Sequence, residues 1–139
     1  MFSSQRVINT LGYAGLIPFV VPALLIIFGS EHSQFLTSLA GSYAFGIICF
    51  LTGSWWGMGL LPGSRPALLL SNLYFLIAFF IFLFEVDVWA LAAAVLLIGI
   101  FLAEQRSSLF PEFPASYRAM RTMLTLIASA SMLTIHLAG

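Results

Sequence analysis

The sequence predicts an all-α integral membrane protein, a compact bundle of five transmembrane helices with its N-terminus in the cytoplasm and its C-terminus outside. The composition is the first observation: 61% of the 139 residues are hydrophobic and 7% are charged, whereas soluble domains are roughly 45–50% apolar and about 25% charged. The second is a series of five apolar stretches, each close to the ~20 residues that cross a bilayer. The third is the placement of the arginines.

Each apolar stretch is expected to form a helix, because backbone groups in lipid must find their hydrogen bonds within the same segment. The expected spans cover about 7–28, 35–61, 66–84, 88–103 and 118–137. The first is longer than the ~7–15 apolar residues of a signal peptide, so we expect it to be retained. The third and fourth are short and separated by three residues, which predicts one long buried hairpin. Residues 1–139 are expected to form a single transmembrane domain.

The arginines give the expected orientation. With five spans, one side of the membrane receives every basic residue of the chain: Arg6, Arg65, Arg106, Arg118 and Arg121. The other side receives acidic residues and no arginine. Because basic residues accumulate in cytoplasmic loops, we expect the N-terminus in the cytoplasm and the C-terminus outside, as in a multi-pass protein of the cell inner membrane.

The second span contains the segment "GSWWG", with Trp55 and Trp56 near its inner end. Indoles favour this depth, where the ring is buried and its N–H reaches polar groups. Gly53 and Gly57 belong to a stripe of small residues, which lets a neighbouring helix approach closely. Packing and interfacial anchoring are the first interpretation. The alternative is that the glycines make room for a lipid or quinone against the indoles.

Polar residues on the third and fifth spans define a possible cavity lining. Asn72 is expected to make an interhelical hydrogen bond, since an unpaired amide in lipid is costly. The fifth span carries a polar stripe whose Ser and Thr side chains either bond to their own backbone or face a small cavity. The possible lining is Asn72, Thr122, Thr125 and Ser129.

The chain offers little for catalysis or metal binding. No phosphate-binding, nucleophile-elbow or dinucleotide motif is present, so we expect no catalytic residues and no cofactor, although an enzymatic role stays open. We expect no metal site; the weak candidates on the outer side are His32, Glu85, Asp87 and His136. A net charge of zero and the lack of lysine lead us to expect no nucleic-acid partner.

Three segments resemble a family of small membrane proteins, domain of unknown function 3429, which is similar to the mitochondrial transmembrane protein 69. They are "LGYAGLIPF" (Leu11–Phe19), "FLTGSWWG" (Phe50–Gly57), and "EQRSSLFPEFP" followed by "SYRAMRTMLT". Ser116 and Met120 depart from the family pattern, where tryptophan and leucine are usual. The resemblance implies five spans in a bacterial inner membrane and no assigned reaction or cofactor.

The matched motifs fall at the inner face, where we expect a structural cluster of Gly53, Trp56, Gly57, Glu104, Tyr117 and Arg121. In this cluster Arg121 would bond Glu104 and lie near Trp56 in a cation–π contact.

Three functions remain open at this point. The first is a non-catalytic accessory, scaffold or lipid-interacting protein, with the bilayer and possibly another membrane protein or a second copy as partners. The second is a carrier or channel for a small neutral or lipophilic molecule through a cavity lined by spans 2, 3 and 5. The third is a membrane enzyme with an outer-face metal site.

Overall fold

A computed structural model describes residues 4–29, 31–60, 63–84, 86–106 and 115–138, and every element within these ranges is helical. The elements are α1 (Ser4–Ala14), α2 (Ile17–Ile27), α3 (Ser33–Leu60), α4 (Arg65–Phe84), the 3₁₀ turn η1 (Val86–Val88), α5 (Trp89–Arg106) and α6 (Ala115–Ala138). The predicted helical membrane fold is confirmed. Four segments are long and apolar enough to cross a membrane, and α5 is a shorter apolar helix.

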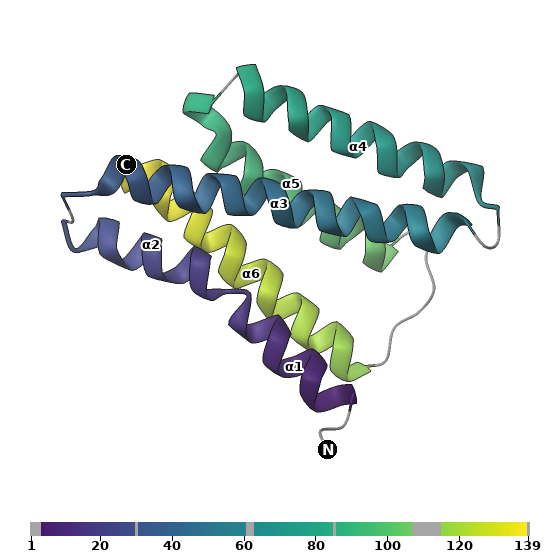
Figure 1. The fold of residues 1–139 in the computed structure, drawn as a ribbon. Helices are drawn as coiled ribbons and strands as arrows, with labels where there is room; N and C mark the ends of the chain where they lie inside the picture. The colour runs from purple at the N-terminus through teal and green to yellow at the C-terminus, as the bar shows by residue number, and fades with distance from the viewer. Residues whose placement is uncertain (1–3, 30, 61–62, 85, 107–114, 139) are drawn as a thin grey trace.

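The helices run back and forth between two ends of the bundle, so the two termini lie at opposite ends (Figure 1). The end that carries the N-terminus also carries the α3–α4 turn and the start of α6. Helix α2 lies against both α3 and α6, and α5 packs against α6. The core between them mixes large side chains with alanines, among them Ala40, Ala44, Ala93 and Ala128, and the alanines allow the helix backbones to approach closely.

Helix α4 lies at the edge of this bundle and contacts mainly α3. Only 17% of its spanning window is buried within the protein, and large apolar side chains such as Leu69 and Phe84 are about 70% exposed. The prediction that the third and fourth spans form a buried hairpin is therefore wrong for α4, the first helix of that pair. Hydropathy is as high for a helix that faces lipid as for one inside the bundle, so it does not separate the two.

The first span is broken between α1 and α2. Pro18 lacks the N–H that a continuous helix needs, and the N–H of Phe19 bonds to the carbonyl of Leu16 at 3.0 Å. The carbonyl of Gly15, which would accept that N–H in an unbroken helix, instead accepts the hydroxyl of Tyr43 on α3 at 2.9 Å. A broken helix is tolerated in lipid when a neighbouring helix satisfies the freed backbone group.

Aromatic donors make the same kind of interhelical bond elsewhere. The Trp89 indole N–H donates to the Gly41 carbonyl of α3 at 2.8 Å, and the Tyr74 hydroxyl donates to the Leu96 carbonyl of α5 at 2.5 Å. Gly99 makes room for Tyr74, because a Cβ there would lie 2.5 Å from the hydroxyl oxygen. These bonds join α3 to α5 and α4 to α5.

The small-residue stripe of α3 does not face a neighbouring helix, which corrects the prediction. A Cβ added at Gly46, Gly53 or Gly57 would meet no atom of the described residues within 4 Å. The close approaches are at Gly41, against Trp89, and at Gly59, where an added Cβ would lie 3.1 Å from Ala67. The regular spacing of small residues identified one helical face, but the packed face is a different one.

We predict that Tyr43→Phe lowers the free energy of unfolding by about 1–3 kcal/mol, because it leaves the Gly15 carbonyl without its donor. The measurement is unfolding in mixed detergent micelles. Tyr13→Phe is the matched control, since Tyr13 is 46% exposed and its loss of a hydroxyl should change little. Equal losses for the two variants would contradict the role of Tyr43 in closing the break.

Candidate functional site

A buried ion pair joins α5 to α6 at the arginine-bearing end of the bundle. Arg121 Nε lies 3.3 Å from Glu104 Oε2, and the two side chains are 8% and 5% exposed. The structure thus places Glu104 and Arg121 together as an ion pair, without a hydrogen bond from Nε to the described residues. Both groups lie inside the bundle rather than at its aqueous surface, so their attraction acts in a low dielectric.

The indole at this pair belongs to Trp55 and not to Trp56. Trp55 on α3 is fully buried, and its Nε1–H donates to Glu104 Oε1 at 3.0 Å. Trp56 is 42% exposed, which corrects the predicted contact between Arg121 and Trp56. Neighbouring helical residues point about 100° apart, so only one of two adjacent indoles can face the interior. Three helices, α3, α5 and α6, therefore meet at one carboxylate.

The guanidinium of Arg121 carries more hydrogen-bond donors than the described residues around it accept. Nη1–H donates to the hydroxyl of Thr125, one turn along α6, at 2.8 Å. Nη2 is buried, and among the described residues it has no hydrogen-bond partner. Unsatisfied buried donors are uncommon in folded proteins and call for an explanation such as a bound molecule.

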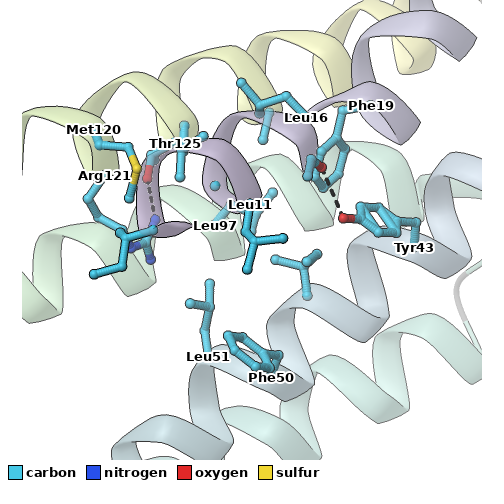
Figure 2. A pocket seen from close by; sticks show the side chains of 16 residues that line it. Leu11, Leu16, Phe19, Tyr43, Phe50, Leu51, Leu97, Met120, Arg121 and Thr125 are labelled. Atoms are coloured by element: carbon cyan, nitrogen blue, oxygen red, sulfur yellow. Dashed lines mark hydrogen bonds between the residues drawn. The ribbon is translucent and has the colours of Figure 1, made fainter. Parts of the chain in front are cut away.

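This guanidinium lines an apolar groove of about 380 Å³. The groove is bounded by α1 and α2 on one side, by α3 and α6 on the others, and by Leu97 of α5. Figure 2 shows the Arg121 guanidinium at one end and the ring of Tyr43 at the other, with Leu11 between them. Apart from Arg121, Thr125 and Tyr43, the lining side chains are apolar.

The groove runs past the break in the first span, and residues on both sides of the break line it. Gly12 and Gly15 both line it, and a Cβ at Gly12 would lie 2.7 Å from the sulfur of Met120, so α1 is held close to α6. Leu11 and Phe50, on opposite sides, are 67% and 73% exposed. In a bilayer these exposed apolar side chains face lipid, and so does the mouth of the groove.

The four residues predicted to line a cavity are not brought together. Thr125 lines the groove. Asn72 is exposed on α4 and donates to the Leu68 carbonyl of its own helix at 3.0 Å, so its expected interhelical bond is absent. Thr122 bonds back to the Arg118 carbonyl. Ser129 is buried against α5, with its hydroxyl 3.5 Å from the Ala94 carbonyl.

Two other members of the predicted inner-face cluster are exposed, and one lies outside the described side chains. Gly53 and Gly57 face outward on α3. Tyr117 lies in the first turn of α6, and its side chain is not among those described. Of the predicted cluster, the structure brings together Glu104 and Arg121.

Three of the four weak metal candidates lie at the opposite end of the bundle. Asp87 and His136 line a second hollow of about 450 Å³, whereas His32 is exposed before α3 and Glu85 lies outside the described residues. Within the described part of the chain no group of three or more His, Cys, Asp or Glu side chains could hold a metal ion.

Sequence reasoning missed the first span as part of the site. Pro18 lies within "LGYAGLIPF" and signals a break in an otherwise helical pattern, but nothing in the sequence shows that Tyr43 would occupy the freed carbonyl.

The sequence matches a known protein family over nearly its whole length. A family model described as "Protein of unknown function (DUF3429)" matches residues 4–137. The chain is 32% identical over 130 residues to Transmembrane protein 69 of Xenopus tropicalis, an alignment that covers 88% of this chain and 50% of that protein. It is 33% identical over 125 residues to Transmembrane protein 69 of Mus musculus, covering 85% and 50%. The chain thus spans about half the length of these curated relatives. No solved structure matches it.

We predict that Trp55→Phe lowers the free energy of unfolding by about 1.5–3 kcal/mol, since it removes a hydrogen bond to a charged group. Trp56→Phe should change it by less than about 0.5 kcal/mol, as is usual for an exposed position. Both values come from unfolding in detergent micelles. A larger effect at Trp56 than at Trp55 would show that the wrong indole has been assigned to Glu104.

Proposed function

The chain belongs to the DUF3429 family of multi-pass membrane proteins of unknown function, and from this premise we propose that it is a non-catalytic, lipid-interacting protein. Its groove between the broken first span, α3 and α6 is the proposed binding site. The ligand is a lipid-soluble molecule that enters sideways from the bilayer.

The observation that carries the proposal is a lipid-facing groove with a polar group at its inner end. Small-molecule sites are typically clefts of ~300–1,000 Å³, mostly apolar, with a few polar groups that fix the orientation of the ligand. The groove, at about 380 Å³ with Arg121 at one end, has this composition. Its exposed rim, formed by Leu11 and Phe50, supports access from the acyl chains.

The carrier alternative needed a cavity lined by spans 2, 3 and 5. Helix α4, which is the third span, contributes no residue to the groove, and Asn72 faces away from the bundle. A groove with a lateral opening supports binding of a ligand more directly than its passage across the membrane.

We also propose that the arginine-bearing end faces the cytoplasm of a bacterial cell, with the chain in the inner membrane. Arg6 and Arg65 lie at the same end of the bundle as the start of α6, and Glu31 and Asp87 lie at the other. This distribution supports the orientation because basic residues are retained on the cytoplasmic side.

The test of the function is to narrow the mouth of the groove with Leu11→Trp. The protein is purified from membranes in mild detergent, and bound lipid-soluble molecules are extracted and counted by mass spectrometry. The variant should carry about tenfold less of the specific ligand, because a change of ~1.4 kcal/mol in binding gives that ratio.

Leu69→Trp on α4 is the matched control, since Leu69 is 71% exposed, much like Leu11 at 67%, and is remote from the groove. The proposed function fails if the extracted molecules are the same in amount and kind for both variants and the unmodified chain.

A further inference from the structure

We propose that the ligand of this groove carries no net charge and presents a carbonyl oxygen to Nη2 of Arg121. The inference rests on the proposed function and adds the chemical class of the ligand: an uncharged lipophilic molecule with an ester or quinone carbonyl at the head of an apolar chain.

The unpartnered donor defines what the ligand must supply. Nη2 carries two N–H groups, and a guanidinium is a donor only. Nη1 donates to Thr125, and Nε lies within ion-pair distance of Glu104 but makes no hydrogen bond to the described residues. Among the described residues, Nη2 alone of the two terminal nitrogens is left without a partner. Nη2 is enclosed by the protein, so a ligand at this end of the groove meets it only after a shift of the Arg121 side chain, and that ligand then has to offer an acceptor.

The Glu104 carboxylate disfavours an acceptor that carries a negative charge. Glu104 and Arg121 form a pair with no net charge, and both are more than nine-tenths buried. A carboxylate or phosphate placed beside them would bring a second negative charge into a low-dielectric site, where an uncompensated ion is costly. A carbonyl oxygen accepts the same hydrogen bond without adding charge.

The rest of the groove favours a ligand whose remaining part, beyond the carbonyl, is apolar. Tyr43 directs its hydroxyl hydrogen to the Gly15 carbonyl, so this end offers a ring face rather than a free donor. Between Tyr43 and Arg121 the lining is aliphatic or aromatic. A chain attached to the carbonyl head leaves through the mouth between Leu11 and Phe50 into the acyl region of the bilayer.

Two kinds of membrane molecule share this chemistry, namely glycerolipid esters and isoprenoid quinones. The experiment therefore measures the affinity of the detergent-purified chain for three probes at pH 8: monoolein, a decyl-substituted benzoquinone, and oleate. Native mass spectrometry reports the bound fraction of each. The inference expects at least one uncharged probe to bind about tenfold or more tightly than oleate, which is ionised.

Glu104→Gln gives a second, independent measurement. The amide oxygen still accepts the Trp55 indole N–H, but the site now carries the positive charge of Arg121 alone. The affinity for oleate relative to that for the uncharged probe should rise about tenfold or more, because both probes lose whatever Glu104 contributes to holding Arg121. Glu31→Gln, at an exposed acidic residue of the opposite end, is the control and should change neither affinity.

The outcomes distinguish a failure of the inference about ligand charge from a failure of the proposed binding function. Binding of monoolein alone assigns an ester ligand, and binding of the benzoquinone alone assigns a quinone; each supports the inference. The inference is overturned if the unmodified chain binds oleate as tightly as it binds both uncharged probes. In that case, a loss of probe binding in Leu11→Trp would still support the proposed function. If no probe binds and Leu11→Trp loses no extracted molecule, both fail.

Discussion

The ion pair between Glu104 and Arg121 is the interaction on which this site depends. Moving two charges out of water costs several kcal/mol for each ion, and their attraction repays that cost only with good geometry and further hydrogen bonds. Trp55 and Thr125 supply such bonds, one to the carboxylate and one to the guanidinium. The pair joins α3, α5 and α6, and it also holds the guanidinium at the end of the groove. The unpartnered Nη2 is what links this structural pair to the proposed ligand.

The second constraint is that lipid leaves no water for backbone groups. This protein satisfies several carbonyls with aromatic donors from neighbouring helices: Tyr43 for Gly15, Trp89 for Gly41 and Tyr74 for Leu96. At the first of these, the segment around the break that frees the carbonyl also lines the groove. Pro18 thus contributes to both the shape of the groove and the need for Tyr43, so the sequence of the first span bears on binding as well as on topology.

Hydropathy and turn residues predicted the helices to within a few residues, apart from the break between α1 and α2, because length and apolar character decide what can cross a bilayer. The Glu104–Arg121 bond could be anticipated because opposite charges on adjacent spans lay at one depth. Which faces of the helices are buried could not be anticipated from the sequence. In lipid, apolar residues suit both the bundle interior and its outside, so neither the choice between Trp55 and Trp56 nor the outward position of Gly53 follows from composition. The groove depends on how α1, α3 and α6 cross, which is a property of packing.

The most direct test of the account is a thermodynamic cycle on the ion pair, measured as free energies of unfolding in detergent micelles for Glu104→Gln, Arg121→Met and the double variant. Arg121→Met should cost about 3–5 kcal/mol because it leaves Glu104 charged and buried without its partner. The double variant should be more stable than Arg121→Met alone, since no buried charge is then left unpaired. Losses that simply add would mean that the two side chains do not interact, and the site built on their contact would be wrong.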